Sequence, residues 1–110
     1  MKIFDLHELA EKSEGEYVLG LKDLNTHAVY IVYGFLLPGE FGRKVLPGKG
    51  HEEILCAVKG EITVNTPEKS FTLKTGEAVH IREDDEWTLE NPGDETANYV
   101  LAGGHPPKKH

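Results

Sequence analysis

The sequence predicts an all-β domain with a short helix at its N-terminus. After residue 15, short segments rich in β-branched and aromatic residues recur along the chain, and turn residues such as Pro38-Gly39 and Asn91-Pro92-Gly93 separate them. With only 110 residues, the chain has room for one hydrophobic core. About eight short strands at this spacing are typical of a sandwich or a barrel.

The N-terminal helix is predicted by its capping residues. Asp5 followed by Glu8 resembles a capping box, in which the first side chain accepts a hydrogen bond from a free backbone N–H of the first turn. We therefore expect a helix over residues 6–12, with Leu6 and Leu9 on one face.

The rest of the chain is expected to form strands and turns. One strand, over residues 53–59, is unusual because its segment ILCAV does not alternate between apolar and polar residues. Such a strand is either central or covered on its outer face by a partner subunit, so residues 54–58 predict a homodimer. The other expected strands lie at residues 16–22, 28–37, 61–65, 70–74, 77–81, 87–90 and 97–102.

Composition narrows the range of functions. We expect one domain over residues 1–110, with the barrel in residues 16–102 and a loose tail in residues 103–110. Asp and Glu number 19 against 12 Lys and Arg, a net charge of −7 that disfavours nucleic acid as a partner. A single cysteine, Cys56, excludes an internal disulfide and favours a reducing compartment. No apolar stretch is long enough for a membrane span or a signal peptide, so we expect a cytoplasmic protein.

Two motifs carry a resemblance to a known family. The segment GKGHEEILCAVKG at residues 48–60 is similar to the later part of the first cupin motif, in which a Glu precedes a hairpin Gly by seven positions, as Glu53 precedes Gly60. The segment from Gly76 to Asn91 is similar to the second motif, without a gap. The resemblance covers residues 34–102 and implies a cupin-type jelly-roll β-barrel.

The usual cupin metal ligands are mostly absent. The two histidines of the first motif fall on Pro47 and Lys49, and the histidine of the second motif falls on Trp87. Only Glu53 remains of the four ligands that the resemblance implies. An indole offers no lone pair to a metal, and one carboxylate does not hold a transition ion against water. We therefore expect no metal at the usual position and no cofactor.

A relocated metal site is the alternative. His51 lies two residues before Glu53, so in an extended strand both side chains project to the same face. The resemblance places the strand that carries His80 beside them. His51, Glu53 and His80 would then supply two imidazoles and one carboxylate to a divalent transition metal. This alternative predicts a metal-dependent oxygenase or isomerase.

The leading hypothesis is a barrel that binds a small organic ligand. The predicted pocket contains Glu53, Trp87, His51, His80 and Lys49. Trp87 supplies a flat apolar surface, and Glu53 supplies a hydrogen-bonding or proton-exchanging group that Lys49 would keep ionised as an ion pair. A third hypothesis is a structural or interaction module whose barrel Trp87 fills. The sequence leaves open whether the protein is an enzyme.

Overall fold

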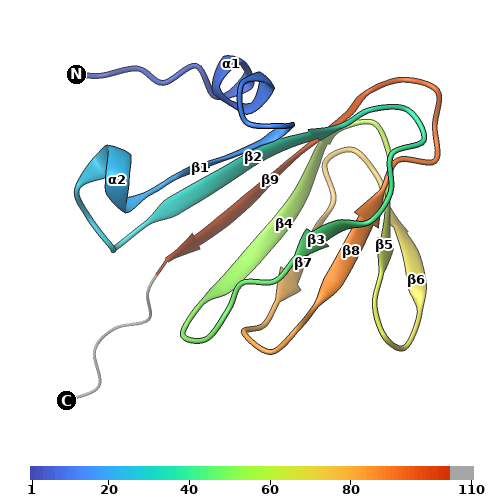
Figure 1. Cartoon of the computed structure of the whole chain (residues 1–110). Helices are drawn as coiled ribbons and strands as arrows, with labels where there is room; N and C mark the ends of the chain where they lie inside the picture. The colour runs from blue at the N-terminus through green and yellow to red at the C-terminus, as the bar shows by residue number, and fades with distance from the viewer. Residues whose placement is uncertain (105–110) are drawn as a thin grey trace.

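The computed structural model describes residues 1–104, which form two antiparallel β-sheets that face each other (Figure 1). One sheet has five strands in the order β1-β2-β9-β4-β7, and the other has four in the order β3-β8-β5-β6. The expected all-β fold with a short N-terminal helix is confirmed. The strands are β1 (Glu16–Leu19), β2 (Tyr30–Leu36), β3 (Arg43–Val45), β4 (Glu52–Lys59), β5 (Ile62–Asn65), β6 (Ser70–Leu73), β7 (Ala78–Ile81), β8 (Trp87–Glu90) and β9 (Ala97–Gly104).

Helix α1 (Leu6–Glu11) begins where its capping residues predict. The Asp5 side chain accepts a hydrogen bond from the backbone N–H of Glu8 at 3.0 Å. The helix lies against the outer face of the five-stranded sheet, where the His7 ring contacts Phe35 with 5.3 Å between ring centroids. Its role is therefore to cover part of that face.

The first strand is shorter than expected. The predicted strand over residues 16–22 ends at Leu19, because Gly20 starts the short helix α2 (Leu21–Leu24). Asn25 ends that helix in the left-handed conformation that asparagine tolerates better than most residues. Figure 1 shows α2 at the left end of β1 and β2, where it connects these two strands.

Two further boundaries differ from the sequence expectation. Strand β3 lies in a segment that was expected to be a loop, and it pairs with β8. Strand β9 continues through Gly103 and Gly104, so these residues belong to the sheet and not to the tail. Residues 105–110 of the expected tail lie outside the described residues.

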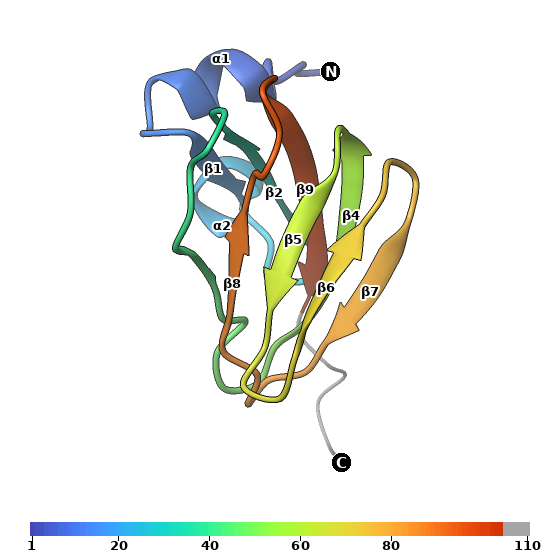
Figure 2. The same cartoon turned by 90° about the vertical axis from the view of Figure 1, so that its right-hand side faces the viewer.

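The core fills the space between the two sheets. Alternate side chains of each strand point inward, as on β4, where Leu55 and Ala57 are fully buried while Ile54 and Val58 remain exposed. Figure 2 shows β5, β6 and β8 of one sheet in front of β4 and β9 of the other. The buried core residues of the facing layers include Leu36, Leu55, Ile62, Val64, Leu73, Ile81, Leu89, Tyr99 and Leu101.

Two tyrosine–glycine pairs join β2 to β9. Tyr30 lies opposite Gly103, and Gly34 lies opposite Tyr99 in the same ladder. A Cβ atom on Gly103 would come within 2.5 Å of the Tyr30 hydroxyl, and one on Gly34 would overlap the Tyr99 ring. Each tyrosine therefore lies across a neighbouring strand that has no side chain at that point. This geometry places both hydroxyl groups in the interior.

Candidate functional site

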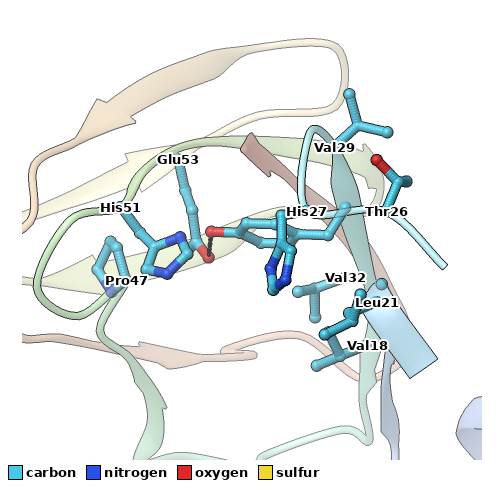
Figure 3. A pocket seen from close by; sticks show the side chains of 11 residues that line it. Val18, Leu21, Thr26, His27, Val29, Val32, Pro47, His51 and Glu53 are labelled. Atoms are coloured by element: carbon cyan, nitrogen blue, oxygen red, sulfur yellow. Dashed lines mark hydrogen bonds between the residues drawn. The ribbon is translucent and has the colours of Figure 1, made fainter. Parts of the chain in front are cut away.

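A pocket of about 360 Å³ opens at the end of the sandwich where α2 and the beginning of β4 come together. Its volume is within the range of small-molecule sites. Figure 3 shows its side chains, which come from β1, α2, the start of β2, the loop after β3 and the start of β4. The lining residues are Val18, Gly20, Leu21, Thr26, His27, Val29, Tyr30, Val32, Pro47, His51 and Glu53.

Glu53 is the acidic group of this pocket. It lies on the inner face of β4, two residues before the fully buried Leu55, and is only 8% exposed. The Tyr30 hydroxyl donates a hydrogen bond to Glu53 Oε2 at 2.6 Å, drawn as the dashed line in Figure 3. The close approach of Tyr30 to Gly103 allows this contact, because the ring reaches β4 across β9.

Burial controls the protonation of this pair. Loss of hydration raises the pKa of Glu53 above its ordinary value of 4.5, and the Tyr30 hydrogen bond lowers it. The charge of Glu16 raises this pKa and the charge of His51 lowers it, both with smaller effects. The net effect is a raised pKa. Burial and the adjacent Glu53 carboxylate both raise the pKa of the Tyr30 hydroxyl, so Tyr30 acts as a hydrogen-bond donor at neutral pH.

The pocket has a polar end and an apolar end. His51 lies beside Glu53, and its ring meets the edge of the Tyr30 ring with 5.7 Å between centroids. Farther from Glu53, Figure 3 shows Val18, Leu21 and Val32 gathered as an apolar wall, with the His27 ring drawn between this wall and Glu53. A ligand that fills the pocket would therefore place a polar group at Glu53 and an apolar body against the valines and the leucine.

A second tyrosine–carboxylate pair, Tyr99 with the partly exposed Glu16, lies outside the pocket. Tyr99 donates a hydrogen bond to Glu16 Oε2 and accepts one from Arg43 Nη1 at 2.8 Å. Arg43 Nη2 also pairs with Glu40 at 2.9 Å. This network keeps Arg43 away from the pocket, where it is not a lining residue. No sequence signal indicated it, since Tyr99 lies 56 residues from Arg43 and 83 residues from Glu16 along the chain.

Trp87 does not lie in the pocket with Glu53. It projects from the same side of β8 as the buried Leu89, so its inward orientation agrees with the motif register. However, its ring packs edge to face against Phe71 with 6.2 Å between centroids, and it lines a separate hollow with Phe71 and Val79. The expected shared pocket of Trp87 and Glu53 is therefore wrong.

His80 is on the outer face of the five-stranded sheet. Val79 and Ile81 point toward the core, so the residue between them points outward, and His80 Nε2 contacts Glu52 Oε1 at 2.5 Å. The relocated ligand set of His51, Glu53 and His80 is consequently not assembled. Within residues 1–104, no group of three or more His, Cys, Asp or Glu side chains is arranged to hold a metal ion.

Lys49 is also outside the pocket. It is exposed in the loop that precedes β4 and does not line the cavity. Among the ion pairs of the described residues, none joins Lys49 to Glu53. The positions that correspond to the usual cupin ligands hold Pro47, Lys49 and Trp87, which supply no suitable donor set beside Glu53. These residues do not fit a bound transition metal.

Comparison with solved structures identifies the fold. A cupin protein from Bacteroides fragilis gives a TM-score of 0.73 at 14% identity, with 100% of this chain and 86% of that chain covered. A conserved protein with a double-stranded β-helix domain from Klebsiella pneumoniae gives 0.73 at 20% identity, covering 96% and 90%. A sugar phosphate isomerase of the cupin superfamily from Silicibacter pomeroyi gives 0.65 at 16% identity, covering 96% and 69%.

The chain therefore has the cupin fold, as its two motifs predicted, and identities this low show the fold alone. No protein-family model and no curated protein matches the sequence. None of the helices within residues 1–104 is long and apolar enough to cross a membrane.

Proposed function

We propose that the protein binds a small organic molecule in the pocket at Glu53, without a metal at the usual cupin position. One observation carries this proposal. A carboxylate that is 8% exposed lines an open cavity of about 360 Å³, and the Tyr30 hydroxyl holds it in place. Burying a carboxylate is costly unless its charge is compensated, so a structural role alone gives little reason to place one here.

The alternatives have less support. A filled barrel is disfavoured because the cavity beside Glu53 is open to a ligand. An enzyme that uses the relocated ligands requires His80 to face Glu53, and His80 instead contacts Glu52 on the outer face. The pocket, with one polar group and an apolar wall, has the composition of a ligand-binding site.

A fragment screen by two-dimensional amide NMR tests this proposal. Bound fragments should shift the amide signals of Tyr30, Val32 and Glu53, while Phe71 and Trp87 in the separate hollow serve as internal controls. The variant Glu53→Gln should change which fragments bind. Hits that cluster around Trp87, or a screen without any hit at the Glu53 pocket, would contradict the proposal.

We also propose that the chain forms a homodimer through the outer face of β4. Ile54 and Val58 are 52% and 43% exposed on this face, although both are large and apolar. Glu52 and Lys59 lie at opposite ends of the strand. If two copies of β4 cross antiparallel, Glu52 of each copy approaches Lys59 of the other, so the surface is complementary to itself around a two-fold axis near Cys56.

Light scattering with matched variants tests the dimer. Ile54→Lys should convert it to a monomer, whereas Phe41→Lys removes an apolar residue of 78% exposure from a different surface and should leave it intact. A mild oxidant should link Cys56 of the two copies, because the axis brings these residues together. A wild-type monomer at micromolar concentration would disprove the proposal.

The free Cys56 thiol is consistent with a reducing compartment such as the cytoplasm, which we include in the proposal.

A further inference from the structure

The charges around the pocket restrict the chemistry of its ligand. Glu53 is the only Asp or Glu among the lining residues, and no Lys or Arg is among them. Among the described residues, the remaining ionisable lining groups are the hydroxyl of Tyr30 and the imidazoles of His27 and His51. An anionic ligand would therefore meet a carboxylate and neither a Lys nor an Arg side chain.

Within residues 1–104, no Lys or Arg side chain forms an ion pair with the Glu53 carboxylate. Its hydrogen bond comes from Tyr30, a neutral donor, at 2.6 Å. The charge of Glu16 opposes ionisation of Glu53, and the charge of His51 favours it to a smaller extent. Arg43 does not compensate Glu53, since its guanidinium contacts Tyr99 and Glu40. A positive group on the ligand would thus gain a charge-assisted hydrogen bond where water is largely excluded.

The opposite end of the pocket is mainly apolar and favours an apolar body over a fully polar ligand, although Thr26 and His27 also line the pocket. Val18, Leu21 and Val32 form a wall that offers no hydrogen-bond partners from their side chains (Figure 3). A sugar or a polyol would bury its hydroxyl groups against this wall without partners, which costs free energy for each group. A compact apolar body gains free energy there in proportion to the area that it buries.

We infer that the pocket takes a primary amine carried on a compact apolar body, with the ammonium group at Glu53 and the body against the valines and Leu21. This inference rests on the proposed function of the same pocket and adds the class of ligand. Glu53 supplies the counter-charge, Tyr30 positions its carboxylate, and the apolar wall selects the body. The net charge of −7 on the chain favours approach of a cation.

Three probes with the same indole body and different end groups test the inference by calorimetry on the full chain at pH 8. Tryptamine carries an ammonium group, tryptophol a hydroxyl group and indole-3-acetate a carboxylate. Tryptamine should bind at least tenfold more tightly than tryptophol, and indole-3-acetate more weakly than either. This ranking is measured on the wild-type protein and so does not depend on the folding of a variant.

Two variants, each lacking one negative charge, test whether the preference for tryptamine over tryptophol depends on Glu53. Glu53→Gln should reduce tryptamine affinity to the level of tryptophol while changing tryptophol affinity by less than threefold. Glu61→Gln removes an exposed charge just beyond the opposite end of β4 and should preserve the tenfold preference, so it controls for net charge.

The outcomes separate this inference from the proposed function. Equal or tighter binding of tryptophol or indole-3-acetate would overturn the amine class and leave the pocket as a binding site. Loss of the preference in Glu61→Gln would also overturn it, because the selectivity would then arise from net charge. If no probe binds, the amine class is overturned, and the fragment screen at Glu53 decides the proposed function by itself.

Discussion

Removal of the Tyr30 hydroxyl should destabilise the protein in a manner that depends on pH. Tyr30→Phe deletes the donor to Glu53, whose carboxylate is 8% exposed. A hydrogen bond to a charged group contributes about 1.5–3 kcal/mol, and one between neutral groups about 0.5–1.5 kcal/mol. We therefore expect a cost of about 2 kcal/mol when Glu53 is ionised and about 1 kcal/mol or less when it is protonated.

The same change should move the pKa of Glu53. The Tyr30 hydrogen bond lowers that pKa, so its loss should raise it further. The difference of about 1 kcal/mol between the costs in the ionised and protonated states corresponds to roughly 0.7 pKa units. For a domain of this size, the cost of about 2 kcal/mol in the ionised state corresponds to a fall in Tm of roughly 8–16 °C at alkaline pH.

Urea denaturation at pH 8 and pH 4 measures the loss of stability, and a carboxyl-carbon NMR titration measures the pKa of Glu53. Tyr17→Phe is the matched control, because the Tyr17 hydroxyl donates to Asp23 at 2.9 Å near the surface and should matter less. In a Glu53→Gln background, Tyr30→Phe should cost the smaller, neutral amount at both pH values. An equal cost of Tyr30→Phe in the wild-type background at pH 4 and pH 8 would refute the argument that the phenol stabilises the carboxylate.

Three further changes test other parts of the structure. Burial raises the pKa of Glu53 above 4.5, so the folded state binds this proton more tightly than the unfolded chain, and stability should fall as pH rises from about 4.5 through the raised pKa. In Glu53→Gln, the free energy of unfolding measured with urea should no longer fall over this pH range. Parallel pH profiles of the wild type and the variant would contradict this prediction. Trp87→Ala should cost about 2 kcal/mol in denaturation, less than the 3–5 kcal/mol of a fully buried ring, and should not alter binding at Glu53. Gly103→Ala should lower Tm, because the new methyl group displaces the Tyr30 ring. The displacement should also change the ring-current shifts of the residues near Tyr30 in NMR spectra. Unchanged spectra would show that the ring is not displaced and would contradict this prediction.

The sequence predicted most elements of the fold, because each rests on local patterns. The strand over residues 87–90 is observed with the same bounds, and the inward orientation of Glu53 and Trp87 follows from the motif register. Register fixes which face a side chain occupies. It does not fix the distance between two sheets, and Trp87 therefore turned out to line a hollow with Phe71 instead of the pocket of Glu53.

The position of His80 could have been predicted from alternation alone. In the segment AVHI, Val79 and Ile81 are apolar neighbours that belong inside, so His80 belongs outside. The contacts of Arg43 with Tyr99 are different in kind. They depend on the pairing of strands far apart in sequence, which no local pattern encodes.

The tyrosine–glycine pairs between β2 and β9 constrain how this sequence can change. At Gly34 any side chain collides with Tyr99, and at Gly103 any side chain collides with Tyr30. A larger residue at either glycine becomes acceptable only after its tyrosine has been replaced by a smaller one, and that replacement removes a hydroxyl that donates to a carboxylate. Substitutions that preserve both hydroxyl groups must therefore leave both glycines unchanged. The two glycines carry no functional group of their own, yet they limit which side chains the space between the sheets can evolve to hold.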